Sequence, residues 1–469
     1  MGDIVHFLHG LPVRGKPGVM GFFVFPPVED SKIGGLSQAN RRGTAGRDGL
    51  TFMGAERLRM FHGYVVTAAG FGVWLIGWGA YSTCFGVFVK PLEAEFGWSR
   101  AEISMAYSLL FFFQALFGIP MGWLTDRLGP RFLTAVVGSL MGLSYLLLSR
   151  VDALWQFIVC YGLLGGLGTS ILNVPVMVAV TRWFVARRGL MMGIVQAGAG
   201  IGGFFFPPLA GWLIQTHGWR SAYWVLGLFC LLGMVLSGLF LHGDPADVGQ
   251  SPDGIRDHVP AMEREEDVSI PAKDSLREEF LSRPFFLLTG IFLSFGFCRA
   301  TFLAHIAPHV QDLGFSLTVG AHLIALISAF SVLGRIGMGR VADRIGNRPA
   351  LVVSFAATAG ILFWGLAAHH LWMLYVFALV FGLAWGSQAV LRFAVTSEAF
   401  GLSSLGLLMG VLSFSESMAA MFGSYIAGDI FDRFGTYAPA FWLGIGFALG
   451  GVALSGLLKG RRPGSLLNS

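Results

Sequence analysis

The sequence predicts an all-α membrane protein whose twelve transmembrane helices form two pseudo-symmetric halves of six. Three observations predict it: an unusually apolar composition, recurrent apolar stretches of spanning length, and a loop motif that occurs twice. Hydrophobic residues make up 54% of the 469 residues and charged residues only 13%, whereas ordinary soluble domains are roughly a quarter charged. A soluble fold of this length could not bury so much apolar surface in one core.

The apolar stretches have the length of membrane-spanning helices. A helix needs about 20 apolar residues to cross the hydrocarbon core, whereas barrel strands have about ten, in alternation. The predicted spans of the first half are 63–89, 102–124, 131–149, 154–181, 189–214 and 219–241. Those of the second half are 284–311, 320–341, 349–368, 371–395, 403–428 and 436–458.

Lys and Arg in the short loops predict the orientation, because loops rich in these residues face the cytoplasm. One set of loops carries most of them: Arg127, Arg131, Arg187, Arg188, Arg340, Arg344 and Arg348. We therefore expect a multi-pass protein of the cell (inner) membrane with both termini in the cytoplasm.

Segments outside the spans complete the predicted organisation. The charge-dense run 263–267 marks a linker between the halves. Met60 immediately precedes the first span, so the residues before it are either a disordered tail or an over-long gene start. The predicted order is a tail over 1–59, the first half over 60–241, a cytoplasmic linker over 242–283, the second half over 284–458 and a basic tail over 459–469.

One loop motif, G-x-x-x-D-R-x-G-x-R, closes the second span of each half. On a structural interpretation, the first Gly allows close helix packing, the Asp pairs with basic residues and the second Gly turns the chain. On a functional interpretation, which we favour, the loops form a conformational latch that breaks and re-forms as the halves rock. The latch residues are Gly122, Asp126, Arg127, Gly129 and Arg131, and then Gly339, Asp343, Arg344, Gly346 and Arg348.

The duplicated loop is similar to the one that marks the major facilitator superfamily. Over most of residues 60–458, further stretches resemble its monocarboxylate and oxalate/formate branch: 85–92 with 96–100, 182–189, and 218–220. The resemblance implies the major facilitator fold and a secondary transporter, not an enzyme. The Gly-Pro signature of drug exporters is absent from span five, where Pro207 and Pro208 follow a Gly-rich run. Its absence weakens a drug-efflux interpretation without removing it.

Ionisable residues inside spans mark candidate transport residues, since each costs about 2.5 to 3.5 kcal/mol on insertion scales. They gather in the second half: Arg299, His305, Arg335 and Glu416. The first half offers polar and aromatic groups, of which we expect Asn173 and Tyr81 to contribute to substrate binding. The halves are thus predicted to differ, one binding charge and the other shaping the cavity.

Arg335 is the leading candidate for substrate binding. The resemblance implies this role, because monocarboxylate carriers place their binding arginine at the matching position, four residues before Gly339. A guanidinium holds a carboxylate through two parallel hydrogen bonds and stays charged. The alternative is a brace between helices, for example to Glu416. Arg299 is predicted to be either a second anion-binding group or the permanent partner of Glu416, and Arg392 is expected to snorkel to the surface.

Glu416, Asp312 and His305 are the candidate proton carriers. Burial would let Glu416 bind a proton near neutral pH, whereas a neighbouring arginine would hold it ionised and inert. His305 could titrate in the physiological range, but a lone histidine in a span is as often a packing residue. The resemblance does not extend to the residues of the proton route. Thr83 and Ser331 stand where animal monocarboxylate carriers have a lysine and an aspartate.

The leading hypothesis is a transporter that moves a small monocarboxylate, such as lactate, pyruvate or acetate, together with a proton by alternating access. The alternatives are exchange of carboxylates without a proton, as in the oxalate/formate type, and efflux of apolar compounds. The expected partners are a small organic anion, a proton and the lipid bilayer, with no nucleic acid and no second copy. No catalytic, nucleotide-binding or metal-binding pattern appears at useful spacing, so neither an enzyme nor a cofactor is expected.

Overall fold

The computed structural model describes residues 61–172, 174–185, 187–254, 278–400 and 405–458. The tails predicted over 1–59 and 459–469 lie outside these residues, as do Asn173 and the middle of the predicted linker. The described chain is helical and contains no strand, which confirms the all-α class. Ten of its helical stretches are long and apolar enough to cross a membrane.

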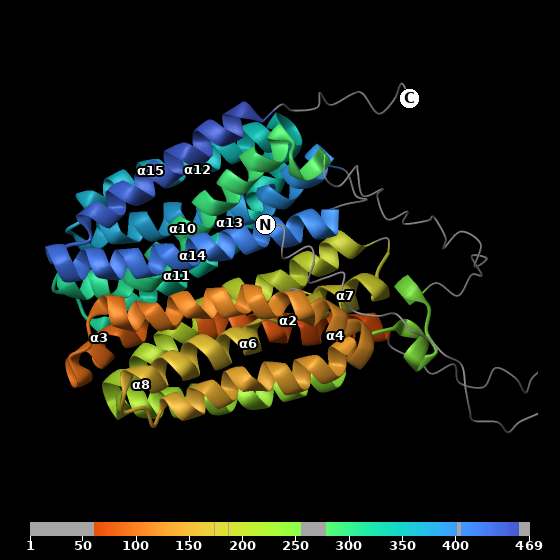
Figure 1. Ribbon diagram of the computed structural model, residues 1–469, viewed down its shortest axis with the longest axis horizontal. Coiled ribbons are helices and arrows are strands. Elements are labelled where there is room, and N and C mark those ends of the chain that lie inside the picture. The colour runs from red at the N-terminus through yellow and green to blue at the C-terminus, as the bar shows by residue number, and fades with distance from the viewer. Residues whose placement is uncertain (1–60, 173, 186, 255–277, 401–404, 459–469) are drawn as a thin grey trace, which may run out of the picture. The chain divides into compact units, whose positions relative to one another are not determined.

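The first half contains four of these stretches (Figure 1). The first joins α2 (His62–Trp74), the π-helical segment η1 (Leu75–Ser82) and α3 (Phe85–Phe96). The third joins α5 (Leu154–Phe157), the π-helical segment η2 (Ile158–Leu164), α6 (Gly165–Thr169) and α7 (Val174–Trp183). The other two are α4 (Arg100–Leu148) and α8 (Arg188–Phe240), after which the chain forms the short helices η3 (Pro245–Val248) and η4 (Pro252–Gly254).

Both α4 and α8 are interrupted at a glycine. They contain 49 and 53 residues, so straight helices would be about 75 to 80 Å long, more than twice the ~30 Å hydrocarbon core. Gly129 in α4 and Gly218 in α8 have φ values of 77° and 81°, in the left-handed region that favours glycine. Each glycine therefore divides its helix into two segments of spanning length.

Contacts with neighbouring helices show that the two segments fold back on each other. Phe113 and Met141 of α4 lie against Gly166 and Gly168 of α6, which are only two residues apart. In a straight helix, Phe113 and Met141 would be separated by about 42 Å. The two segments of α8 likewise contact adjacent residues of η1: Gly202 with Leu75, and Gly233 with Ile76. With α4 and α8 each divided in two, the ten stretches correspond to twelve helical segments of spanning length.

The second half contains six separate helices, which pack lengthwise beside one another (Figure 1). They are α10 (Arg283–Asp312), α11 (Leu317–Ile345), α12 (Asn347–Leu366), α13 (Leu371–Phe400), α14 (Leu405–Phe434) and α15 (Ala438–Leu457). Both α10 and α11 begin with a serine N-cap, Ser282 and Ser316, whose side chain accepts a backbone N–H of the first turn.

Close packing inside the first half depends on glycine, and this dependence can be tested. A methyl group at Gly142 of α4 would lie 2.5 Å from the Cα atom of Leu231 on α8. A backbone atom cannot yield through a rotamer change, and overpacking costs typically about 1 to 3 kcal/mol. We therefore expect Gly142→Ala to lower the melting temperature of the purified protein. Gly360→Ala is the control, since no heavy atom lies within 4 Å of that position; equal melting temperatures would contradict the packing.

The contact between α4 of the first half and α14 of the second half differs along the two helices. We call the end where Gly129 and Gly346 turn the chain the motif end, and the opposite end the far end. At the far end, Gly428 of α14 lies against the backbone of Arg100 on α4. Farther along the same two helices, a methyl group at Gly118 or Gly410 would have no heavy atom of the described chain within 4 Å. The helices α4 and α14 are therefore in close contact at the far end and not at these two positions nearer the motif end.

Candidate functional site

Three charged side chains of the second half, two of them buried, form a cluster within their helices. The carboxylate of Glu416 on α14 accepts a hydrogen bond from Nη1 of Arg392 on α13 at 2.6 Å. Its other oxygen lies 3.6 Å from Nη2 of Arg299 on α10. Both arginine side chains are 5% exposed, and that of Glu416 is 17% exposed. Two arginines thus share one carboxylate, and the cluster carries a net positive charge.

The first half contributes aromatic faces to this cluster. The guanidinium of Arg299 lies 5.0 Å from the ring centroid of Trp78 in η1 and 4.9 Å from that of Phe111 in α4. Such cation–π contacts stabilise a desolvated cation by roughly 2 kcal/mol. Arg299 therefore lies where the halves meet, whereas Arg392 packs over Phe295 of its own half at 3.6 Å.

Arg335 also reaches across to the first half. Its Nη1 donates to the backbone carbonyl of Gln196 on α8 at 2.8 Å. The structure does not contain the predicted alternative, an ion pair between Arg335 and Glu416. Glu416 is paired instead with Arg392 and Arg299. Close packing of α11 on α13 at Gly334 and Gly386 places Arg335 near this cluster.

Four buried nitrogen atoms in this region have no hydrogen-bond partner among the described residues: Nη1 of Arg299, Nε of Arg335 and Nε1 of Trp74 and Trp78. The two indole rings stack at 6.4 Å, and that of Trp78 lies beside Arg299. Guanidinium and indole N–H groups can only donate, and a buried donor without an acceptor costs about 1 to 3 kcal/mol. An acceptor oxygen of a ligand is the kind of group that would satisfy each of them. We refer to Arg299, Arg335, Arg392 and Glu416 with these two indoles as the central site.

The structure corrects the prediction for Arg392. It also shows that the aromatic ring of η1 beside the charged cluster is that of Trp78 and not that of Tyr81. Arg392 does not snorkel: its side chain is buried and its charge is paired with Glu416. Tyr81 is buried inside the first half, where its hydroxyl lies 2.7 Å from Oγ of Ser144. Tyr81 lies in the π-helical η1, whose wider turn spaces its side chains differently from those of an α-helix. Asn173 lies outside the described residues.

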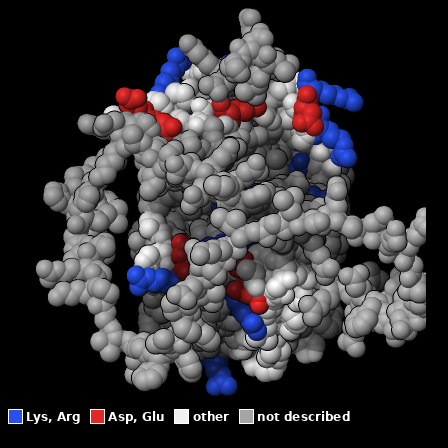
Figure 2. Space-filling model, turned by 90° about the vertical axis from the view of Figure 1, so that its right-hand side faces the viewer, with Lys and Arg blue, Asp and Glu red and all other residues white. Residues whose placement is uncertain are grey.

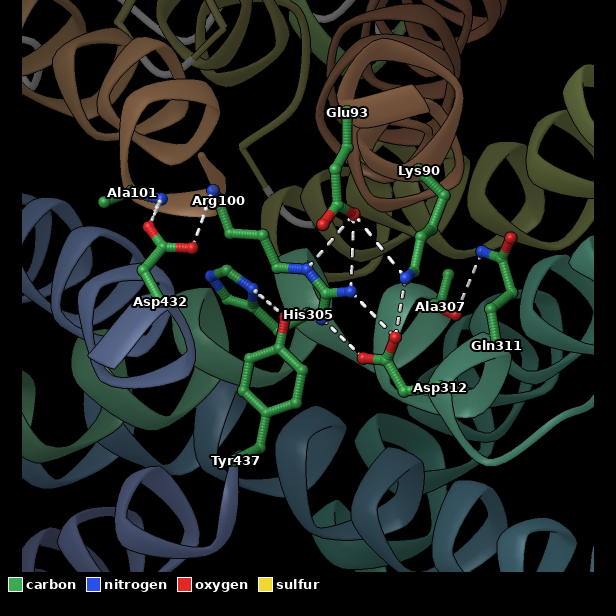
Figure 3. Close-up of polar contacts among 10 residues, drawn as sticks. All are labelled: Lys90, Glu93, Arg100, Ala101, His305, Ala307, Gln311, Asp312, Asp432 and Tyr437. Atoms are coloured by element: carbon green, nitrogen blue, oxygen red, sulfur yellow. Dashed lines mark hydrogen bonds and ion pairs between the residues drawn. The ribbon is translucent and has the colours of Figure 1, made fainter. Parts of the chain in front are cut away.

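A second polar cluster closes the far end between the halves (Figure 3). Arg100, at the start of α4, is 1% exposed and makes a bidentate ion pair with Asp312 at the end of α10, with contacts of 2.5 and 2.8 Å. Lys90 of α3 lies 2.6 Å from the same carboxylate. Asp432 of α14 accepts the backbone N–H groups of Arg100 and Ala101 at 3.0 and 2.7 Å. We call these residues the far-end cluster.

The predicted proton candidate His305 is joined to this cluster through Tyr437. Its Nδ1 lies 3.0 Å from the Tyr437 hydroxyl, which also accepts a hydrogen bond from Arg100 at 2.9 Å. Burial raises the pKa of Tyr437, in the connection between α14 and α15, well above its usual range, so the hydroxyl stays protonated. The Nε2 atom of His305 lies 2.9 Å from the Ser424 carbonyl. Both ring nitrogens of His305 therefore have hydrogen-bond partners in this conformation.

The two latch motifs make their contacts within their own halves. Gly129 and Gly346 turn the chain with φ values of 77° and 90°, as the structural interpretation predicts. Asp126 lies 3.4 Å from Arg182 of α7, and Arg348 donates to the carbonyl of Ser455 at 3.1 Å. Among the described residues, no hydrogen bond or ion pair joins either motif to the opposite half. Figure 2 shows charged side chains of both signs around this end of the bundle.

The sequence analysis missed Arg100 and Trp78, although Arg100 carries a local signal. Ser99 and Glu102 form a capping box at the start of α4, so Arg100 places a positive charge in the first helical turn. The helix dipole disfavours a cation there, which indicates a compensating tertiary partner. That partner is Asp312, 212 residues away in the chain.

Comparisons with known proteins agree with this architecture. The sequence model of the Major Facilitator Superfamily matches residues 69–363 and 323–469. Monocarboxylate transporter 13 of Rattus norvegicus is 27% identical, covering 78% of this chain and 82% of that protein. The Agnestins efflux protein AgnL12 of Paecilomyces divaricatus is 25% identical, covering 79% and 82%. A bacterial homologue of the human lysosomal transporter Spinster, solved in an inward-facing and occupied conformation, has a TM-score of 0.66 at 15% identity, covering 86% of this chain and 97% of that chain.

Proposed function

Because this chain belongs to the major facilitator superfamily of membrane transporters, we propose that it moves a small monocarboxylate anion across the cell membrane together with a proton. The observation that carries this proposal is the surplus of donors at the central site. Three arginines face one glutamate there, and four buried N–H groups lack acceptors among the described residues. A carboxylate supplies both the negative charge and the acceptor oxygens.

Within the central site, we assign anion binding to Arg335 and Arg299. Each has a buried N–H group with no partner among the described residues, and each lies against the first half. Arg392 makes the closer contact with Glu416, 2.6 Å against 3.6 Å for Arg299. Arg392 is therefore the lasting partner of Glu416, and Arg299 is free to hold the substrate.

Glu416 is the candidate proton site for this cycle. A substrate carboxylate at Arg299 would place a second negative charge beside it, and two neighbouring carboxylates favour binding of a proton. Asp312 takes a different part in the proposal. Its pairing with Arg100 and Lys90 holds it ionised in this conformation, so we assign it to closure of the far end.

Alternating access is supported by the unequal contacts at the two ends of the bundle. The far-end cluster joins the halves, whereas the latch motifs contact only their own halves. We propose that the motif end is cytoplasmic and that this conformation is inward-facing. Formation of the latch and rupture of the far-end cluster would then accompany the outward-facing state.

The names of the similar proteins support a carboxylate substrate and also a second candidate function. Those of Rattus norvegicus and Homo sapiens are monocarboxylate transporters, whereas that of Paecilomyces divaricatus is an efflux protein. Efflux of a larger, aromatic compound is favoured by the two stacked indoles at the central site. Competition for uptake by aromatic compounds, but not by lactate, would distinguish this second function.

Uptake into proteoliposomes tests the proposal directly. Purified protein is reconstituted, and labelled lactate, pyruvate and acetate are offered with and without an inward-directed proton gradient. We expect a tenfold gradient to raise the steady-state accumulation of at least one of them by about tenfold, since it adds ~1.4 kcal/mol of driving force for each proton that enters with an anion. Uptake only into liposomes preloaded with carboxylate, and indifferent to the gradient, would establish exchange instead. No transport of any of the three by folded protein would withdraw the substrate class.

A further inference from the structure

We infer that Tyr145 and Tyr161 are positioning residues for the substrate, because their hydroxyl groups hold the π-helical segment η1 in the form that turns Trp78 toward the central site. This inference rests on the proposed function and adds to it two residues that lie inside the first half. Two observations carry it. Carbonyl groups at the end of η1 accept hydrogen bonds from these tyrosines, and the side chains of Trp78 and Tyr81 point to different surroundings.

The end of η1 takes its hydrogen-bond donors from side chains. The last four carbonyl groups of a helix have no partner within it, and a bilayer core offers no water to replace one. Three of the last four residues of η1, Gly79, Ala80 and Tyr81, have a carbonyl that accepts a hydroxyl group. The backbone N–H of Thr83 bonds the carbonyl of Trp78, five residues earlier, which is the π-helical pattern. The hydroxyl groups therefore stabilise this pattern.

Two of the donors come from other spans of the first half. Tyr161 of η2 donates to the carbonyl of Tyr81 at 2.9 Å. Tyr145 of α4 reaches the same carbonyl at 2.9 Å and that of Ala80 at 3.2 Å. In return, the Tyr81 hydroxyl lies 3.3 Å from the carbonyl of Tyr161, so the two π-helical segments are joined in both directions. A methyl group at Gly165 would overlap the Tyr81 hydroxyl, so this glycine permits the contact.

The rings of these tyrosines fix the places of their hydroxyl groups. The ring of Tyr81 stacks on that of Tyr145 at 4.5 Å and on that of Tyr161 at 5.0 Å. All three side chains are fully buried, and a close-packed interior leaves them few other rotamers. A phenylalanine at position 145 or 161 would therefore keep the packing and lose only the hydrogen bond.

The π-helical form decides where Trp78 points. Residues three apart lie on one face of an α-helix, but Trp78 and Tyr81 have different surroundings. The ring of Trp78 lies 5.0 Å from the guanidinium carbon of Arg299 in the second half, whereas the Tyr81 hydroxyl lies 2.7 Å from Ser144 inside the first half. The wider turn of a π-helix separates these two side chains. A regular α-helix would bring them toward one face and move the indole N–H of Trp78 away from the central site.

The test is the double variant Tyr145→Phe/Tyr161→Phe, which removes both hydroxyl groups and keeps both rings. We measure the KM and the maximal rate of uptake into proteoliposomes at a fixed proton gradient, with whichever of lactate, pyruvate and acetate the wild type takes up fastest. We expect KM to rise about fivefold, the effect of one lost hydrogen bond, with the maximal rate within about twofold. The melting temperature shows whether the variant folds; if it does not, Tyr161→Phe alone replaces it.

The matched control is Tyr223→Phe, the same substitution in the same group of rings. The ring of Tyr223 lies 5.2 Å from that of Tyr145 and is also fully buried. Its hydroxyl has no hydrogen-bond partner among the described residues, so its removal leaves η1 unchanged. We expect Tyr223→Phe to have the KM of the wild type. A similar rise of KM in this variant would overturn the inference, because any change in the rings would then disturb binding.

A mutant cycle with Trp78→Phe shows whether the tyrosines act through Trp78. The Trp78→Phe variant should itself raise KM. Adding Tyr145→Phe/Tyr161→Phe to it should change KM by less than about twofold, because the indole that the tyrosines hold is already gone. If the two effects on KM multiply instead, the tyrosines do not act through Trp78 and the inference is overturned.

Amide hydrogen exchange over residues 75–82 gives a second measurement that needs no substrate. Exchange should be faster in Tyr145→Phe/Tyr161→Phe than in the wild type and in Tyr223→Phe, because η1 loses its hydroxyl donors. Unchanged exchange, or an unchanged KM in a folded variant, would overturn the inference and leave the proposed function intact. Failure of the wild type to take up any of the three carboxylates would instead remove the proposed function, while faster exchange would still assign both tyrosines to the form of η1.

Discussion

The Arg335→Gln variant is expected to reduce carboxylate uptake by about 100-fold or more while the protein remains folded. A hydrogen bond to a charged group contributes about 1.5 to 3 kcal/mol, and loss of a bidentate pair therefore corresponds to roughly 100-fold to 10,000-fold in affinity. Glutamine can still donate to the carbonyl of Gln196, so the contact between α11 and α8 can persist. The measurement is initial uptake at a fixed proton gradient, together with the melting temperature.

The control for this experiment is Arg150→Gln, which removes the same charge from an exposed position at the end of α4. Its uptake should equal that of the wild type. Near-normal uptake by Arg335→Gln would exclude Arg335 as the substrate-binding arginine and leave Arg299 as the candidate. Loss of uptake with a melting temperature lowered by many degrees would instead assign Arg335 a structural role.

The Arg100→Gln variant is expected to shift the conformational equilibrium toward opening of the far end. Removing one partner of a buried ion pair costs about 3 to 5 kcal/mol, and Lys90 compensates part of this by remaining on Asp312. A residual change of ~2 to 3 kcal/mol would alter the ratio of the two states by roughly 30-fold to 150-fold. Spin labels at the exposed positions 150 and 433, one in each half, should show a longer distance in the variant.

The control for the second experiment lies at the same end of the molecule. Arg220 contacts Glu95 and Asp152, and all three residues belong to the first half. Arg220→Gln removes a far-end arginine without breaking a contact between halves, so the distance between the labels should stay as in the wild type. An unchanged distance in Arg100→Gln would show that the far-end cluster does not hold the halves together.

The helices and their connections could be predicted from sequence because their causes are local. Apolar stretches of about 20 residues must satisfy their own backbone hydrogen bonds in a bilayer, and helices do this without a partner. Gly129 and Gly218 turn the chain between spans, since their backbones adopt positive φ values. The loop motifs that resemble the major facilitator superfamily are also short stretches of sequence. The model of that family matches most of the chain, which confirms the resemblance.

Arg335, Arg299 and Glu416 could be singled out for a related reason: a charge within an apolar stretch is visible in the sequence itself. Their partners were not visible. The sequence left Arg299 open as the partner of Glu416, offered Arg335 only as an alternative partner, and placed Arg392 at the surface. The structure shows that Arg392 makes the closest contact with Glu416.

The sequence by itself therefore determined the fold class, the apolar stretches and the presence of Arg299, Arg335 and Glu416 within them. Only the tertiary structure decided which of those charges meet. Arg392 and Glu416 are 24 residues apart, and Arg100 and Asp312 are 212 apart on opposite halves. Each pair depends on how two helices are rotated and shifted against each other, and in η1 a π-helical turn changes that rotation. A helical period gives the spacing of side chains along one helix but not the face that a neighbouring helix presents.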